Sequence, residues 1–325
     1  MAGPLRGHLD GAAADRGRDL GVAAAPPYPL RGVAGHARGA VGGGGGVRAG
    51  PHAAGRLLPR RGVEGVVVGR DDAGAGRTPG MGAGVAPVRR MRRPWRIEAV
   101  TPERGDATTL TLAPVGHPGI RFAPGQFGWL TVDRSPFAIT AHPFSFSSSA
   151  EDHDRVAITI KALGDFTATV GDIAPGTRAY LDGPHGVFTP DRNEGPGFVL
   201  IAGGVGITPM VSILRTMADR GDRRPFLLLY AVRTVAEQTF DAEIDALSRR
   251  LDLTVVLVPQ DPPPGWPGES GFVDAALLRR HLPDRHERRQ YFICGPAPMV
   301  TAVEDALAAL DVPAERVHTE RFTFV

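Results

Sequence analysis

The sequence has only one cysteine, Cys294, and this scarcity excludes two kinds of site. An internal disulfide needs a second cysteine, and an iron–sulfur cluster needs about four cysteine ligands. Any redox centre of that kind must lie elsewhere. Histidines at the spacing of a helical metal-ligand pair are also absent from the sequence, and we therefore predict no metal site.

Long apolar runs are absent as well. The longest, residues 198–214, is interrupted by three glycines and by Pro209, whereas a membrane-spanning helix needs about 20 apolar residues. The first 20 residues alternate Gly, Ala, Arg and Asp without the apolar centre of a secretory signal. The net charge of +2, from 37 basic and 35 acidic residues, gives no reason to expect nucleic-acid binding. We expect a cytoplasmic chain with no membrane span.

Residues 1–88 contain no Ser, Asn, Gln, Lys, Ile, Phe, Trp or Cys and consist mainly of Gly, Ala, Arg, Pro and Val. A segment with so few aromatic and branched apolar side chains to bury cannot offset the entropy lost when its backbone is ordered. Residues 1–91 are therefore predicted to be a disordered tail, or else to be a GC-rich reading frame translated out of register. Composition does not decide between them, because the whole chain shares this bias and has a single lysine, Lys161.

From Trp95 onward the sequence changes to short alternating runs bounded by Pro and Gly, which are typical of antiparallel strands. The runs lie at residues 96–100, 108–113, 126–132, 155–161 and 177–182. With one more strand in the segment that starts at His142, they predict a six-stranded antiparallel barrel over residues 92–189.

After a polar stretch, strands and helices alternate. The apolar run 198–202 is typical of a buried parallel strand, and the helix after it has Thr208 as a cap, Pro209 in its first turn and Gly221 at its end. This alternation predicts a doubly wound α/β domain over residues 196–325. Its other strands are expected at 226–230, 253–258 and 291–294, and its other helices at 239–250, 273–281 and 297–310.

Two phrases in this second domain follow predicted strands. Gly203-Gly-Val-Gly-Ile-Thr-Pro209 joins a strand to a helix amino terminus, where free N–H groups favour a phosphate and glycines let a ligand approach. A tight turn without a ligand is the alternative. Cys294-Gly-Pro296 ends a later strand, so its thiol is expected at the carboxyl edge of the same sheet. The alternative is a small buried apolar residue.

The predicted barrel carries a third phrase, His142-Pro-Phe-Ser-Phe-Ser-Ser148. Alternation along a strand places Phe144 and Phe146 on one side and the serines on the other. By itself the phrase is typical of an ordinary barrel strand. The turn 161–167, however, ends the next strand with a cation, N–H groups and a hydroxyl that are suited to a pyrophosphate.

In this order the three phrases resemble the ferredoxin-NADP reductase superfamily over about residues 92–325, and more narrowly its ferric-reductase and NADPH-oxidase branch. The wider superfamily has arginine where His142 stands, whereas that branch has the phrase HPF[ST]. The superfamily's C-G-P phrase matches residues 294–296, and its G-x-G-x-x-P phrase matches Gly204, Gly206 and Pro209.

The resemblance implies FAD as cofactor and NADPH or NADH as co-substrate, with Ser145 near the flavin N5 and Cys294 in contact with the nicotinamide rather than acting as a nucleophile. A carboxyl-terminal aromatic that shields the flavin is matched to Phe322, with Phe324 as the alternative. The candidates near the reacting atoms are Ser145, Cys294, Glu320 and Phe322. The cofactor-binding candidates are His142, Pro143, Phe144, Ser145, Lys161, Gly164, Thr167, Gly203, Gly204, Gly206, Thr208, Pro209, Arg233, Gly295 and Pro296. Arg233, suited to a 2′-phosphate or else simply solvated, favours NADPH.

The implied activity is hydride transfer from NAD(P)H to FAD, followed by release of single electrons to an acceptor such as ferric iron or haem. Two alternatives are the reductase component of a multi-component oxygenase and a nucleotide-binding module without turnover. Relatives often carry a membrane domain or a ferredoxin domain. A ferric chelate, a haem, a small redox protein, a membrane partner or a missing membrane domain therefore all remain open, and the natural acceptor is not fixed.

Overall fold

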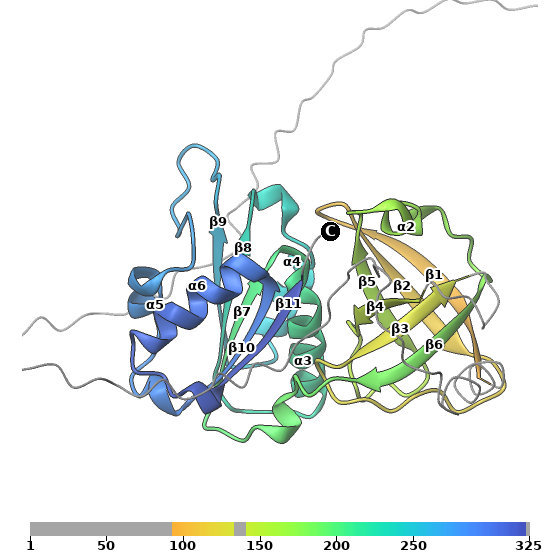
Figure 1. The fold of residues 1–325 in the computed structure, drawn as a ribbon, viewed down its shortest axis with the longest axis horizontal. Helices are drawn as coiled ribbons and strands as arrows, with labels where there is room; N and C mark the ends of the chain where they lie inside the picture. Colours follow the sequence, from red (N-terminus) through yellow and green to blue (C-terminus); the bar gives the residue numbers. More distant parts are fainter. Residues whose placement is uncertain (1–92, 133–140, 323–325) are drawn as a thin grey trace, which may run out of the picture. The chain divides into compact units, whose positions relative to one another are not determined.

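The structure, a computed structural model, describes residues 93–132 and 141–322 (Figure 1). The tail 1–91 and Phe324 lie outside the described residues, so the predictions made for them stay predictions. Within the described ranges, no helix combines the length and the hydropathy needed to cross a membrane.

The first part of the fold is a six-stranded antiparallel sheet with the order β4-β3-β6-β1-β2-β5. Its two edges are joined by one bridge between Phe146 and Ile158, as the predicted barrel requires. Its core consists of alternate, inward-facing apolar side chains, among them Ile97, Leu112 and Phe146. Its strands are β1 (Pro94–Glu103), β2 (Ala107–Pro114), β3 (Phe127–Val132), β4 (His142–Ser145), β5 (Val156–Lys161) and β6 (Arg178–His185). A short helix, α2 (Asp165–Ala168), follows β5.

The second part is a five-stranded parallel sheet with the order β11-β10-β7-β8-β9. One apolar core lies between the sheet and helices α3 and α4, and another lies between the sheet and helices α5 and α6 (Figure 1). The predicted doubly wound fold is therefore confirmed. The strands are β7 (Phe198–Gly203), β8 (Phe226–Val232), β9 (Leu253–Pro259), β10 (Gln290–Pro296) and β11 (Val317–Phe322). The helices are α3 (Ile207–Asp219), α4 (Asp241–Ser248), α5 (Ala275–His281) and α6 (Ala297–Ala308).

Each predicted run overlaps an observed element, but the start of α3 differs from the prediction. A 3₁₀ turn, η3 (Gly204–Gly206), winds directly into the helix, so Gly206 is the N-cap and already has helical dihedrals. Thr208 is therefore not the cap. It lies inside the first turn, where its hydroxyl donates to the carbonyl oxygen of Val205 at 2.9 Å.

The chain order places a switch point between β7 and β10. From β7 the chain proceeds through β8 and β9 on one side and then returns to build β10 and β11 on the other. Sheets of this kind bind ligands in the crevice at the carboxyl ends of the strands where the order reverses. Turn 203–206 and residues 294–296 lie at these ends. The fold thus brings together two phrases whose first residues, Gly203 and Cys294, are 91 positions apart in the sequence.

Candidate active site

Most glycines at the switch point are required by the contact between the two phrases. A Cβ on Gly206 would lie 2.1 Å from the carbonyl oxygen of Cys294, and one on Gly203 would lie 3.0 Å from the Cδ of Pro296. A Cβ on Gly295 would lie 3.2 Å from the Cα of Gly203. These three glycines therefore allow the turn after β7 to pack against the end of β10, a role that the sequence did not indicate.

Gly204 is different. It has φ +52°, in the left-handed region, and a Cβ there would have nothing within 4 Å. Open space at Gly204, immediately before the amino terminus of α3, is suited to a phosphate-bearing ligand. The prediction that glycine allows close ligand approach therefore fits Gly204 best, whereas Thr208 and Pro209 are buried in the first turn of α3.

Cys294 and Glu320 are register partners on the parallel strands β10 and β11. The thiol is fully buried, and the carboxyl group is only 6% exposed. Burial raises the pKa of Glu320 to about 8. Burial, with a smaller contribution from Glu320, also raises the pKa of Cys294 well above its usual value. A thiol held protonated in the apolar core is unsuited to nucleophilic attack. Its full burial fits the alternative of a small buried apolar residue, and its contact with the nicotinamide stays a prediction.

A continuous line of neighbours connects Ser145 in the barrel with Cys294 in the sheet. Ser145 is the register partner of Phe127 on β3. Gly186 lies between Phe127 and Glu320. A Cβ built on Gly186 would be 3.2 Å from the Phe127 ring and 3.7 Å from a carboxyl oxygen of Glu320. Since Glu320 pairs with Cys294, the buried hydroxyl, carboxyl and thiol groups named by the sequence all lie along one path.

Phe322, the predicted shielding residue, ends β11 and is the register partner of Pro296. It is partly buried and packs against the core on the side of the sheet that carries α3 and α4. The predicted shield and the predicted C-G-P phrase are therefore neighbours at the carboxyl edge of the sheet.

The phrase that begins at His142 forms an aromatic platform with a residue that the sequence analysis missed. The His142 ring stacks on Phe166 of α2, with centroids 4.3 Å apart and planes 5° apart, and Phe144 stacks on Phe166 at 6.4 Å. Phe144 is partly exposed, whereas Phe146 is fully buried in the barrel core. Such a platform offers flat apolar surface to a planar ring. Pro143, between the two platform residues of β4, is buried.

The predicted pyrophosphate turn uses several of its polar groups internally. The hydroxyl of Thr167 accepts hydrogen bonds from the backbone N–H groups of Leu163 and Gly164, at 2.9 and 2.8 Å. It donates in turn to the carbonyl oxygen of Gly164 at 3.0 Å. Gly164 and Thr167 therefore stabilise this turn, and their predicted contact with a pyrophosphate stays a prediction.

Glu237, in the 3₁₀ turn η4 (Val235–Glu237), binds both predicted cations. Its carboxylate contacts the ammonium of Lys161 at 3.1 Å and the Nε of Arg233 at 2.7 Å. Burial pushes the pKa of Glu237 upward, but hydrogen bonds from Lys161 and Arg233 outweigh burial and hold this pKa below its usual value. The Arg233 side chain is 70% exposed. One carboxylate that the sequence analysis did not select thus pairs with both cations that were expected to meet phosphates.

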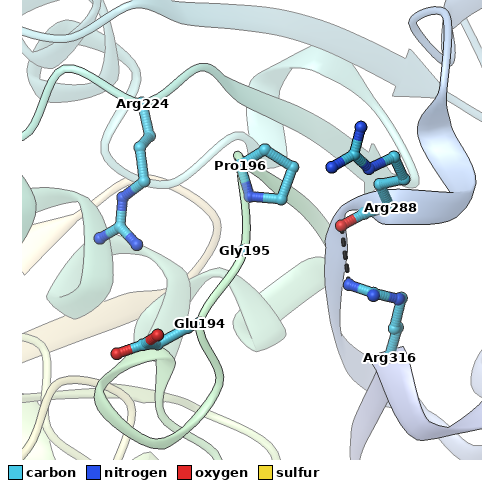
Figure 2. A pocket seen from close by; sticks show the side chains of 6 residues that line it. All are labelled: Glu194, Gly195, Pro196, Arg224, Arg288 and Arg316. Carbon is cyan, nitrogen blue, oxygen red and sulfur yellow. Dashed lines mark hydrogen bonds between the residues drawn. The ribbon is translucent and has the colours of Figure 1, made fainter.

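A hollow of about 460 Å³ lies away from this arrangement, beside the amino-terminal ends of the parallel strands (Figure 2). Two of its guanidinium groups already have partners. Arg224 pairs with Asp222 and lies over the ring of Phe198 at 4.6 Å, and Arg316 donates to the carbonyl oxygen of Arg288 at 2.8 Å. The hollow is on the opposite edge of the sheet from the switch point and is not the candidate site. Its lining residues are Glu194, Gly195, Pro196, Arg224, Arg288 and Arg316.

Comparison with known proteins agrees with this geometry. Residues 106–186 match an FAD-binding domain, and residues 200–305 match the oxidoreductase NAD-binding domain. The chain is 31% identical over 249 residues to the reductase component of propane 2-monooxygenase from Mycolicibacterium goodii. The aligned region covers 74% of this chain and 70% of that relative. The chain belongs to the ferredoxin-NADP reductase superfamily. Its two matched domains are therefore of the kinds that bind FAD and a nicotinamide nucleotide.

Two further comparisons bear on the extent and the fold of this chain. The propane 2-monooxygenase reductase component of Rhodococcus jostii is 32% identical over 249 residues, 74% of this chain and 65% of that one. The chain thus spans slightly less than two thirds of that relative. The flavohem-like FAD/NAD-binding domain of nitric oxide dioxygenase from Vibrio cholerae is 25% identical with a TM-score of 0.63, covering 71% of this chain and 98% of that domain.

Proposed function

We propose that this chain takes hydride from NAD(P)H at the switch point and passes electrons one at a time to a separate acceptor. FAD, when bound, supplies the acceptance of hydride and the release of single electrons. The observation that carries the proposal is the line of neighbours from Ser145 to Cys294, because it connects the FAD-binding strand β4 to the NAD-binding strand β10.

The residues along this line have separate tasks in the proposed reaction. Cys294 and Glu320 form a buried, water-poor wall in which a carboxyl group with a pKa of about 8 holds a proton at neutral pH. Gly204 leaves open space that the nucleotide phosphates would occupy. Phe322 would cover the face of the bound flavin and would have to yield to the nicotinamide. Ser145 is assigned the hydrogen bond near the flavin N5.

The acceptor that we propose first is ferric iron, as a chelate or in a haem. The His142-Pro-Phe-Ser145 phrase supports this choice, because it has histidine where the wider superfamily has arginine. The proposed compartment is the cytoplasm, which suits a chain with a single cysteine. A second candidate function, a reductase component that serves an oxygenase, is favoured by the two propane 2-monooxygenase relatives. It requires an iron–sulfur partner, because Cys294 alone cannot hold a cluster.

Colour and bleaching test the proposed activity. The purified chain is expected to be yellow and to lose its visible flavin absorbance when NADH is added without oxygen. Reoxidation by a ferric chelate is expected to be faster than reoxidation by an added ferredoxin, and the reverse order supports the oxygenase reductase. A colourless protein that binds nucleotide and transfers no electrons would contradict both and identify a binding module.

For the co-substrate we propose NADH, in contrast to the NADPH favoured by the sequence. Glu237 accepts from the Nε of Arg233 and places a negative charge beside the guanidinium that would have to bind a 2′-phosphate. Glu237→Gln is expected to raise kcat/KM for NADPH about tenfold relative to NADH, or about 1.4 kcal/mol. Steady-state kinetics with both nucleotides measure the ratio. The matched control is Asp241→Asn, which removes the carboxylate that pairs with Arg104. An unchanged ratio in Glu237→Gln would refute this assignment.

A further inference from the structure

Helix α3 contacts both halves of the proposed site. Its amino terminus follows the turn at Gly204. Its middle and second half contact residues 147–150, shortly after β4. The hydroxyl of Ser212 donates to the carbonyl oxygen of Ser148 at 2.8 Å. The backbone N–H of Ala150 donates to the hydroxyl of Thr216 at 2.9 Å. Both hydroxyl-bearing side chains are fully buried, so these hydrogen bonds are shielded from water.

Arg215 lies between Ser212 and Thr216 on α3 and adds a charged hydrogen bond to the same segment, residues 147–150. Its guanidinium donates to the carbonyl oxygen of Ser147 and binds both carboxylate oxygens of Glu243 on α4. It also lies over the ring of Phe240, 5.3 Å from the ring centroid. Because the carboxylate and the ring fix its plane, the guanidinium holds the Ser147 carbonyl in one position relative to α3.

Ser147 is equally fixed on the barrel side. Its backbone N–H donates to the carbonyl oxygen of Ala157 at 2.8 Å, and its hydroxyl accepts from Thr159 at 3.0 Å. Ser145 precedes it by two residues on the same extended segment. A shift of the Ser147 carbonyl therefore moves the strand that carries Ser145.

We propose that Arg215 is a positioning residue that sets the distance between the flavin-facing strand β4 and the nucleotide turn before α3. This inference rests on the proposed function, in which hydride crosses between these two elements. Alignment of two reacting rings is sensitive to small displacements, and a shift of about 1 Å costs about 100-fold in rate. Arg215 acts through Ser147 and Glu243 and contacts neither reacting ring.

The test compares Arg215→Gln with Arg220→Gln. Arg220 caps the same helix and bridges Glu151 and Asp191, but it is more exposed, and exposed ion pairs contribute little. With saturating NADH and no oxygen, Arg215→Gln is expected to reduce its flavin about 10- to 100-fold more slowly than the wild type. Arg215→Lys keeps one donor for Ser147, and its reduction rate is expected to lie between the rates of Arg215→Gln and the wild type. The rate of Arg220→Gln is expected to match that of the wild type.

Two measurements separate positioning from a general loss of structure. FAD content and Tm are expected to stay near wild-type values in Arg215→Gln, while backbone amides of residues 147–150 exchange with deuterium faster than in Arg220→Gln. An unchanged reduction rate, or a loss that merely follows the loss of FAD, overturns the proposal. Should Arg215→Gln fail to fold, Glu243→Gln keeps the guanidinium but frees it, and the same slower reduction is expected.

The outcomes also distinguish this inference from the proposed function. If wild-type flavin is not reduced by NADH or NADPH, the proposed function fails, whereas the exchange measurement still reports whether Arg215 holds residues 147–150. If wild-type flavin is reduced and the rates for Arg215→Gln and Arg220→Gln are equal, only the positioning role fails.

Discussion

Gly206→Ala is expected to lower the free energy of unfolding by about 3 kcal/mol or more. The added Cβ would lie 2.1 Å from the carbonyl oxygen and 2.6 Å from the carbonyl carbon of Cys294. These are backbone atoms, so no side-chain rotation relieves the clash, and the turn after β7 has to separate from β10. The measurement is the denaturant midpoint followed by circular dichroism, together with Tm.

The matched control for this change is Gly204→Asn in the same turn. Gly204 has φ +52° and open space beyond its Cα, and asparagine is among the residues that tolerate the left-handed region best. A loss of about 1 kcal/mol or less is expected there. A loss in Gly206→Ala as small as the loss in Gly204→Asn would mean that strand packing does not require Gly206, and would restore the interpretation that both glycines serve ligand approach.

The contrast between these glycines shows how far the sequence alone reaches. Strands of a parallel sheet end at one edge, so the sequence sufficed to predict that turn 203–206 and the phrase at Cys294 belong to one site. It did not reveal that Gly206 and Cys294 contact each other directly, because that depends on β7 and β10 being adjacent in the sheet. The start of α3 was misplaced for a local reason: a 3₁₀ turn continues into the helix without an extended cap residue.

Strand β11 was not predicted because its residues lack an apolar alternation. Residues 317–322, Val-His-Thr-Glu-Arg-Phe, form an edge strand in which the buried carboxyl of Glu320 takes a place usually held by an apolar side chain. Only pairing with β10 identifies this segment as a strand. The sequence selected Glu320 and Phe322 by resemblance alone.

Other residues of the site were missed because their partners are distant in the sequence. Glu237 meets Lys161 across 76 positions, and Arg215 meets Ser147 across 68. No local pattern reports such pairs. Phe166 lies inside the turn 161–167 selected from the sequence, yet its stacking on His142 requires α2 and β4 to be neighbours. Local patterns thus predict the strands and the turns, whereas the contacts between the domains need the three-dimensional structure.

Glu320→Gln is expected to remove a strong pH dependence of stability. The ordinary pKa of this carboxyl is 4.5, and burial raises it to about 8 in the folded chain. Between these values the folded state keeps a proton that the unfolded state has lost, so wild-type stability falls as pH rises. The slope is about 1.4 kcal/mol per pH unit, and the total loss is on the order of 4 kcal/mol by about pH 8. Glutamine stays neutral and carries no such penalty.

The measurement is the free energy of unfolding, from denaturant titrations between about pH 5 and about pH 9. The variant is expected to match the wild type at the acidic end and to exceed it progressively toward the alkaline end. Glu315→Gln, which removes an exposed carboxyl shortly before β11, controls for the loss of one negative charge. Parallel curves for wild type and Glu320→Gln would show that Glu320 ionises freely. The Glu320 carboxyl beside Cys294 would then be charged at neutral pH. It would not hold the proton that the proposed function assigns to it.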